Sequence, residues 1–250
     1  MGDLAAFDYM AVCERLRTDQ EEHARQQEYK GSSTAVAPEI IPVTRRKAEW
    51  LSAWGVPTRM RDNVIPQEMV DENGEYVVDE NGEQRMAGLV NTKALGAISD
   101  FMKCGKEAWC LVLSADKGAG KSTAAAYWLS VLAGKKAEMP DKPPTYWHTG
   151  PGLARVNSYG EEWERLIKVQ NMVIDDLGIE YMDRNGNLLT RLDELLYTRH
   201  NEYLKTVITT NLNGGDFRRR YGERISDRIR EGIPHGGGLI EIDDKSMRYG

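Results

Sequence analysis

The sequence has no long apolar run, few cysteines and no surplus of positive charge, and each absence excludes a class of protein. No uninterrupted apolar stretch in the 250 residues approaches the roughly 18 residues that a membrane-spanning helix needs. The three cysteines, Cys13, Cys104 and Cys110, form neither a metal-ligand spacing nor the even set of a disulfide framework. Acidic residues outnumber basic ones by 39 to 33, a net charge of −6, so any nucleic-acid contact must come from a local patch.

The start of the chain does not resemble a secretory signal. Asp3 and Asp8 stand where a signal peptide would carry Lys or Arg. Together with the absence of a spanning segment, this predicts a cytoplasmic protein with reduced cysteines and no membrane contact.

Residues 1–60 are expected to form a helical extension and a linker. Residues 4–29 carry apolar side chains mainly in their first half, which predicts an amphipathic helix with a solvated second half. Residues 44–53 predict a second short helix, with Trp50 and Trp54 as apolar anchors. The first helix either binds a partner or is loosely attached, and the sequence leaves both interpretations open.

Residues 61–89 are expected to form an acidic insertion. The pentad Asp-Glu-Asn-Gly-Glu occurs at residues 71–75 and again at 79–83, on either side of a Tyr-Val-Val triplet. Asn-Gly pairs supply the positive φ angles that two-residue hairpin turns need, so the segment predicts a surface β-hairpin. Its negative charge argues against DNA contact.

From residue 90 to the end, apolar strands alternate with helices. Runs of β-branched and aliphatic residues that are apolar on both faces predict a parallel sheet with helices on each side. Residues 90–250 should therefore form one α/β domain. The expected strands are 109–113, 145–147, 172–174, 206–208 and 238–242, and the expected helices are 94–102, 122–132 and 188–204.

The first of these strands runs through a glycine-rich loop directly into a helix. The loop, Ala-Asp-Lys-Gly-Ala-Gly-Lys-Ser at residues 115–122, is called the phosphate loop below. Its glycines let backbone N–H groups turn toward a phosphate, and the helix N-terminus adds partial positive charge. Lys121 should reach the β- and γ-phosphates and Ser122 should ligate Mg²⁺. An ordinary glycine-rich turn is the alternative. The predicted nucleotide-binding residues are Gly118, Ala119, Gly120, Lys121, Ser122 and Thr123.

Two acids close the strand at residues 172–174. In a parallel sheet, carboxylates at such a strand end should lie beside the phosphate loop, on a neighbouring strand. We assign Asp175 to the Mg²⁺ ion and Asp176 to the water that attacks the nucleotide. A pair of aspartates that merely caps the strand is the alternative interpretation.

Two later features add candidate catalytic residues. Asn211 follows the strand at 206–208, at the sheet edge where ligands bind, although asparagine is also common in turns. The segment 217–230 is the only dense basic stretch, and Arg224 and Arg228 lie four residues apart on one helix face. A guanidinium from such a helix could stabilise transition-state charge at a neighbouring subunit's γ-phosphate. A solvated helix with internal ion pairs is the alternative.

In order and type, these motifs resemble the AAA+ ATPases of the DnaC/IstB group, the bacterial and phage replicative helicase loaders and transposition helper ATPases. The resemblance covers about residues 90–244, and the block Gly-Glu-Arg-Ile-Ser-Asp-Arg at 222–228 is its most telling part. It implies an α/β P-loop sandwich with a five-stranded parallel sheet that assembles into a ring or spiral with ATP between subunits. It also implies roles: Lys121 and Ser122 resemble Walker A, Asp175 and Asp176 Walker B, Asn211 sensor 1, and Arg228 the arginine finger with Arg224 beside it.

The chain departs from the group's pattern at several points. Ala115 replaces the first glycine of the phosphate loop, which requires a negative φ there, and Asp116 must point away from the triphosphate. Some twenty residues follow Arg228, too few for a helical lid, so no sensor-2 arginine is assigned. By resemblance, single-stranded DNA would meet the segment at about residues 150–159, with Arg155, Asn157 and Tyr159 as candidate contacts.

The sequence as a whole predicts an ATP- and Mg²⁺-dependent switch. The resemblance implies self-association, and action on single-stranded DNA or a replicative helicase during DNA replication. A transposition helper that works with a transposase shares every motif named and remains an alternative. A nucleotide-binding adaptor with little turnover is a third interpretation, in which Ala115 and Asp116 are marks of decay.

Overall fold

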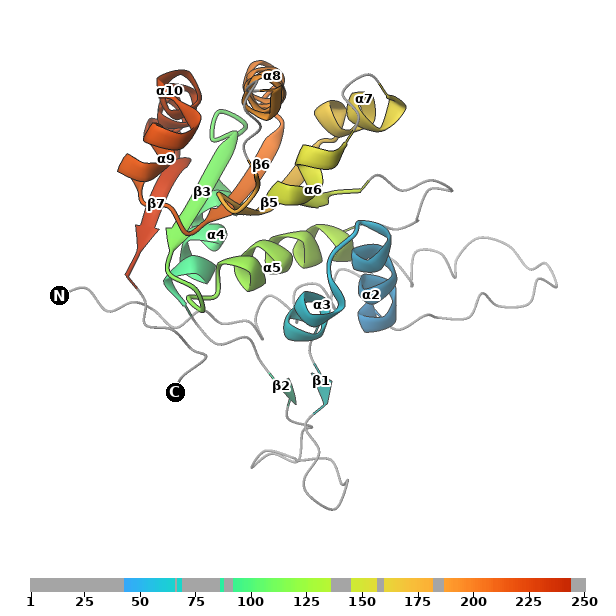
Figure 1. Ribbon diagram of the computed structural model, residues 1–250. Helices are drawn as coiled ribbons and strands as arrows, with labels where there is room; N and C mark the ends of the chain where they lie inside the picture. The colour runs from blue at the N-terminus through green and yellow to red at the C-terminus, as the bar shows by residue number, and fades with distance from the viewer. Residues whose placement is uncertain are drawn as a thin grey trace.

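A computed structural model describes residues 43–65, 67–68, 86–87, 92–135, 145–156, 160–181 and 187–243. One five-stranded parallel sheet forms the centre of this part of the chain (Figure 1). Its strands are β3 (Cys110–Ala115), β4 (Trp147–Thr149), β5 (Asn171–Leu177), β6 (Lys205–Thr210) and β7 (Gly238–Ile242). They lie in the order β4-β5-β6-β3-β7, and the predicted α/β fold with a five-stranded parallel sheet is confirmed.

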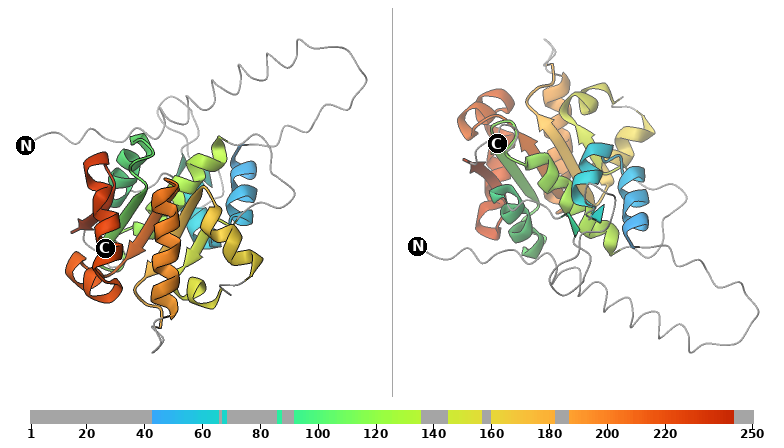
Figure 2. Two further views of the ribbon diagram at one scale, coloured as in Figure 1. Left: turned by 90° about the horizontal axis from the view of Figure 1, so that it is seen from above. Right: turned by 90° about the horizontal axis from the view of Figure 1, so that it is seen from below.

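Helices cover both faces of the sheet. Figure 1 shows α5, α4, α2 and α3 on one face and α7, α8 and α10 on the other, and Figure 2 shows the same layers from above and below. The helices are α2 (Val43–Ala53), α3 (Thr58–Val64), α4 (Lys93–Lys103), α5 (Lys121–Gly134), α6 (Gly150–Arg155), α7 (Glu161–Lys168), α8 (Asn187–Asn201), α9 (Gly214–Tyr221) and α10 (Glu223–Glu231), with a 3₁₀ turn at Ile233–His235.

Strand β3 and helix α5 are the most deeply buried elements because each has protein on every side. All six residues of β3 are buried, between β6 and β7 in the sheet and between helices above and below. Helix α5 lies between the sheet and the pair α2 and α3, and buries residues around most of its circumference. The phosphate loop joins these two elements, so it is held between two rigid parts of the core.

The segment 43–65 packs into the same core as the sheet. The predicted short helix and its anchors are confirmed, since Trp50 and Trp54 are buried and their ring centroids lie 5.2 Å apart. The Trp54 ring also lies 4.7 Å from that of Tyr146, just before β4. The boundary placed at residue 90 stays a prediction, but α2 and α3 share their apolar contacts with the α/β layers.

Two predictions of the N-terminal third fall on residues that the structure does not describe. The helix over residues 4–29 lies outside the described residues, as do the turns of the acidic hairpin. The described base of that insertion is β1 (Gln67–Glu68), which pairs antiparallel with β2 (Met86–Ala87). Among the described residues, no helix has the length and apolarity needed to cross a bilayer.

Some predicted boundaries are wrong for local reasons. Helix α8 ends at Asn201, three residues early, because Tyr203 adopts a φ of 52° and the chain turns into β6. Strand β4 starts at Trp147, two residues late. The basic segment 217–230 forms two helices, because Gly222 has a φ of 86° and separates α9 from α10.

Candidate nucleotide-binding site

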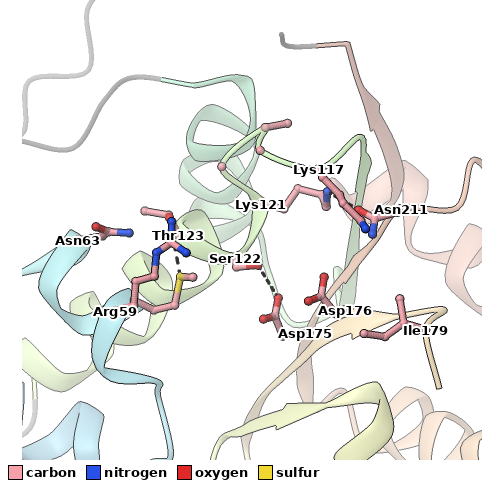
Figure 3. A pocket seen from close by; sticks show the side chains of 14 residues that line it. Arg59, Asn63, Lys117, Lys121, Ser122, Thr123, Asp175, Asp176, Ile179 and Asn211 are labelled. Atoms are coloured by element: carbon pink, nitrogen blue, oxygen red, sulfur yellow. Dashed lines mark hydrogen bonds between the residues drawn. The ribbon is translucent and has the colours of Figure 1, made fainter. Parts of the chain in front are cut away.

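An open cavity of about 460 Å³ lies at the carboxyl ends of β3, β5 and β6 (Figure 3). The phosphate loop and the start of α5 form its floor, and the two acids of β5 and Asn211 form one wall. Helix α3 forms the wall on the other side. Each predicted nucleotide-binding residue lines this cavity, as do Asp175, Asp176 and Asn211.

The backbone of the phosphate loop depends on two glycines. Gly118 and Gly120 have φ angles of 95° and 79°, which side chains with a Cβ rarely adopt. Gly120 is also the N-cap of α5, and no side chain caps this helix. The first N–H groups of α5 therefore begin at the cavity without a capping side chain, which is the arrangement that binds phosphate.

The two departures in the loop are accommodated. Ala115 is the last residue of β3, and in the described residues only Asp176 and Tyr203 among non-glycines have a positive φ. An alanine Cβ is therefore compatible with the backbone at position 115. Asp116 is exposed and is not among the residues that line the cavity.

Lys121 connects the loop to the end of β6. Its Nζ donates hydrogen bonds to the backbone oxygens of Ala115 at 2.7 Å and Asp116 at 2.9 Å, and to Asn211 Oδ1 at 3.0 Å. The side chain is buried against the loop at the cavity wall. Lysine and asparagine are thus brought together at one end of the cavity.

Ser122 and Asp175 meet although their strands are not neighbours. Strand β6 lies between β3 and β5, so the prediction of adjacent strands is wrong. Ser122 nevertheless donates a hydrogen bond to Asp175 Oδ1 at 2.7 Å (Figure 3), because α5 begins at the loop and contacts both β6 and β5. A hydroxyl and a carboxylate at this spacing are hard oxygen ligands, which suit a Mg²⁺ ion that keeps phosphate and water as its other ligands.

Thr209 also contributes to the site, although no role was predicted for it from the sequence. Its hydroxyl donates to Asp175 Oδ1 at 2.6 Å and accepts from the Asp176 N–H at 2.9 Å. Burial raises the pKa of Asp175, and the hydrogen bonds from Thr209 and Ser122 offset only part of that rise. A bound cation would favour the charged carboxylate. The signal in the sequence was a hydroxyl two residues before Asn211.

Asp176 has a strained backbone. Its φ of 52° is unusual for a residue with a Cβ, and the pairing of β5 with β6 shifts register between Ile174 and Leu177. The side chain is half-buried and lines the cavity. Strain of this kind persists where the surrounding structure over-determines it, and it is frequent at functional sites.

Helix α3 supplies cavity residues that no sequence pattern indicated. Arg59, Met60 and Asn63 line the side opposite Asn211, and Thr123 Oγ1 lies 3.9 Å from Met60 Sδ (Figure 3). These residues precede the phosphate loop by more than fifty positions and form no motif of their own. Only the packing of α3 on α5 brings them to the cavity.

The two arginines of the basic segment lie outside the cavity. Both are on α10, which packs against α8 and β7 on the face of the sheet away from α5. Arg228 forms an ion pair with Asp193, its guanidinium lies 4.9 Å from the Tyr197 ring centroid, and 13% of its side chain is exposed. Arg224, with 80% of its side chain exposed, lies 3.6 Å from Asp193. Within one chain the structure does not bring them to the nucleotide site.

The candidate DNA-contacting residues are only partly described. Arg155 ends α6 and is exposed. Asn157 and Tyr159 lie outside the described residues.

Several solved structures resemble this domain. A protein of Streptococcus pyogenes serotype M3, described as a "putative primosome component", matches 78% of this chain and 93% of its own, with 22% identity and a TM-score of 0.50. The fold is that of the streptococcal protein. The DnaC helicase loader matches 60% of this chain and 87% of its own, at 19% identity and a TM-score of 0.46. DnaI matches 62% and 82%, at 21% identity and a TM-score of 0.46.

These neighbours are of the kind that the sequence motifs resemble. At identities below 25%, the likeness concerns the fold. No protein-family model and no curated protein matches the chain. What the site does must therefore be argued from its own residues.

Proposed function

We propose that this chain is an ATPase of the helicase-loader type, which binds ATP and Mg²⁺ between copies of itself and acts on single-stranded DNA or a replicative helicase. The observation that carries the proposal is the contact between Ser122 and Asp175 at 2.7 Å, beside Lys121 and at the floor of an open cavity. The adjacent Lys121 and Ser122 supply the ammonium and the hydroxyl, and Asp175, 53 residues after Ser122, supplies the carboxylate that a metal-bound triphosphate requires.

Different parts of the cavity carry groups that suit the phosphates, the metal ion and the nucleoside of ATP. The phosphate loop offers backbone N–H groups and Lys121 to the phosphates, and Ser122 and Asp175 would hold Mg²⁺. Helix α3 lies on the far side of Thr123, where Arg59 and Asn63 could contact the base or ribose. Its volume of about 460 Å³ falls in the range of small-molecule sites.

Hydrolysis would depend on Asp176 and Asn211. Asp176 would orient the attacking water and take its proton, while the phosphorus–oxygen bond to ADP breaks. Asn211, which already accepts a hydrogen bond from Lys121, would hold the γ-phosphate or the water.

Self-association would add an arginine to the nucleotide site. Arg224 and Arg228 lie on α10, outside their own chain's cavity, so they could act only on nucleotide held by another copy. Arg228 is held by Asp193 and Tyr197, which would orient its guanidinium, and Arg224 is largely exposed. Arginine fingers supplied in this way raise turnover by about 10³-fold or more.

The first test is whether the protein hydrolyses ATP and what Asp176 contributes. We expect Mg²⁺-dependent turnover that rises with protein concentration, measured by phosphate release with and without single-stranded DNA. Asp176→Asn should keep nucleotide affinity and lower turnover by about 100-fold or more. Asp100→Asn, at an exposed aspartate of α4 that pairs with Lys103, is the matched control and should behave as the wild type.

The outcomes separate the alternatives. Nucleotide binding without turnover in the wild-type protein would favour an adaptor and contradict the ATPase. Size measurements with and without ATP and single-stranded DNA would test assembly. Pull-down with a replicative helicase, compared with pull-down with a transposase, would decide between a helicase loader and a transposition helper.

A further inference from the structure

Glu180 is a buried carboxylate that the nucleotide site does not use. It lies in the loop that follows the acids of β5, and its side chain has no exposed surface. Its neighbours in the chain point the other way, since Ile179 is 60% exposed and Tyr181 is 80% exposed. A fully buried carboxylate costs free energy unless it is paired, so its partners matter.

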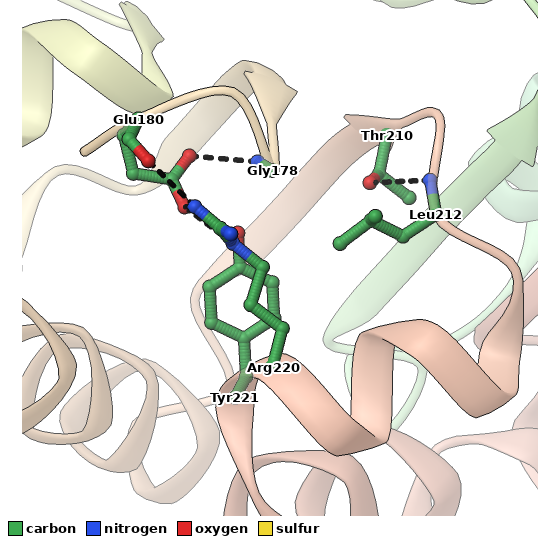
Figure 4. Close-up of polar contacts among 6 residues, drawn as sticks. All are labelled: Gly178, Glu180, Thr210, Leu212, Arg220 and Tyr221. Atoms are coloured by element: carbon green, nitrogen blue, oxygen red, sulfur yellow. Dashed lines mark hydrogen bonds and ion pairs between the residues drawn. The ribbon is translucent and has the colours of Figure 1, made fainter. Parts of the chain in front are cut away.

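The partners of Glu180 come from two separate parts of the chain (Figure 4). Its Oε2 accepts the Gly178 N–H at 2.7 Å, within its own loop. Its Oε1 accepts the Tyr221 hydroxyl at 2.6 Å and Arg220 Nη2 at 3.1 Å, from the end of α9. Burial pushes the pKa of Glu180 up, but hydrogen bonds from Tyr221, backbone N–H groups and Arg220 outweigh it, so the pKa lies below its usual value.

Gly178 and Tyr221, which both hydrogen-bond to Glu180, lie next to the two groups of residues proposed to act in ATP hydrolysis. Gly178 lies two residues after Asp176, which faces the nucleotide cavity of the same chain. Tyr221 immediately precedes Gly222, the junction from which α10 and its two arginines begin. Glu180 therefore links the loop that would sense a chain's own nucleotide to the helix that would act on the next copy's nucleotide.

The chain changes direction at Gly222, and the link through Glu180 holds the α9 side of this junction. Gly222 has a φ of 86°, and an added Cβ there would meet no atom of the described residues within 4 Å. Position 222 therefore contributes no side chain that fixes the angle between the helices, and buried Ile225 and Ile229 hold α10 against its neighbours beyond it. On the α9 side of the junction, Tyr221 and Arg220 fix it through Glu180, and on the far side Arg228 pairs with Asp193 of α8.

We propose that Glu180 is a positioning residue that sets the orientation of α10, and through it the action of Arg224 and Arg228 on ATP held by a neighbouring copy. This inference rests on the proposed function. It predicts a defect that appears in the neighbouring subunit's site and not in the site of the subunit that carries the substitution.

Tyr221→Phe is the sharpest substitution, because it removes one hydroxyl and leaves the Gly178 hydrogen bond to Glu180 in place. We expect nucleotide affinity within about threefold of wild type and turnover of the assembled protein lowered about tenfold, the effect of losing one hydrogen bond to a charged group. Tyr203→Phe, at a largely exposed tyrosine outside both sites, is the matched control and should change neither quantity.

Mixing subunits tests whether the defect acts on the neighbour. Lys121→Ala subunits should bind no ATP but should still present an intact α10. Adding them to Tyr221→Phe subunits should raise turnover severalfold, as they should also do for Arg228→Ala subunits. Glu180→Gln, with thermal unfolding as a folding check, provides a second variant that should be rescued in the same way.

Two results would overturn the inference. One is unchanged turnover in folded Tyr221→Phe and Glu180→Gln. The other is a loss that Lys121→Ala subunits do not repair, although they do repair Arg228→Ala. If the wild type shows no turnover, or Arg228→Ala is not repaired either, the proposed function fails first and the inference fails with it.

Discussion

Lys121 and Arg199 are both buried cations beside the sheet, but they lie at opposite edges and only Lys121 lines an opening. Lys121 lies at the carboxyl edge, donates to two carbonyls and Asn211, and forms part of a cavity wall. Arg199, with no exposed surface, lies at the amino edge. It donates to Thr206 Oγ1 at 2.7 Å and to the carbonyls of Val169 and Lys205, each at 2.8 Å.

Burial of a cation alone therefore does not identify a ligand site. Burial lowers the pKa of Arg199 to about 9, and its guanidinium still serves only to join α8 to the starts of β5 and β6. The ammonium of Lys121 instead lies against the phosphate loop, and this loop lines the same cavity as the carboxylates of Asp175 and Asp176. A buried cation is a candidate for phosphate binding when other groups converge on the same space.

The largest expected effect on stability is at the structural cation. Arg199→Met should lower the free energy of unfolding by about 3 to 4 kcal/mol, because two buried carbonyls and the Thr206 hydroxyl lose their donor. Urea unfolding would measure it, and nucleotide affinity of the folded fraction should stay within about threefold. Arg165→Met, at an exposed arginine of α7, is the control and should show no measurable change. A loss below about 1 kcal/mol for Arg199→Met would contradict the structural role of this arginine.

At the nucleotide site we expect a large effect on ATP affinity and a small effect on stability. Lys121→Ala should weaken ATP binding at least about 100-fold, which corresponds to about 2.7 kcal/mol, while unfolding changes by about 1 kcal/mol or less. Titration with a fluorescent nucleotide measures the first quantity and urea unfolding the second. Lys168→Ala, at an exposed position of α7, should leave both at wild-type values. Undiminished binding by folded Lys121→Ala would contradict the site itself.

Substitution of Gly150 tests a crowded region of the protein, next to Glu180. An added Cβ at Gly150 would lie 2.6 Å from Glu180 Oε2 and 3.0 Å from the Asp176 carbonyl oxygen. Gly150→Ala should therefore destabilise the protein by about 1 to 3 kcal/mol and disturb turnover. Circular dichroism during thermal unfolding and phosphate release would measure the two effects. Equal stability of Gly150→Ala and wild type would show that the packing around Glu180 yields easily.

The smallest effect is expected in helix α4. Among the described residues, a Cβ at Gly96 would meet nothing within 4 Å, so Gly96→Ala should stabilise the protein by about 0.5 to 1 kcal/mol through reduced freedom of the unfolded chain. Thermal unfolding would again measure it. A loss of stability in Gly96→Ala would contradict the expected gain from reduced freedom of the unfolded chain.

The sequence predicted the parallel sheet and the residues of the phosphate loop because both signals are local. An apolar run followed by Gly-x-Gly-Lys-Ser specifies a strand, a turn and a helix start without reference to the rest of the chain. The place of Asn211 at the ligand-binding edge of the sheet followed from its position at a strand end. The same reasoning placed β5 beside β3, and that was wrong because strand order depends on crossovers that no short window contains.

Other features depend on contacts between distant segments and could not be predicted. The contribution of Arg59 and Asn63 arises from the packing of α3 on α5, and the burial of Glu180 arises from the end of α9. Arg199 carries no local sign of burial, since it occupies a helix of otherwise ordinary polarity. Gly222 is a residue type that often ends a helix, but its sequence context also fits a continuous basic helix.

The carbonyl of Trp54 accepts the N–H groups of both Tyr146 and Trp147, where β4 forms one outer strand of the sheet. The segment 43–65 thus covers the start of an outer strand that would otherwise be open to pairing with foreign chains. A recombinant fragment that starts at residue 90 would retain every catalytic candidate named above. It would nevertheless be expected to aggregate, whereas one that starts at residue 43 should remain well behaved in solution.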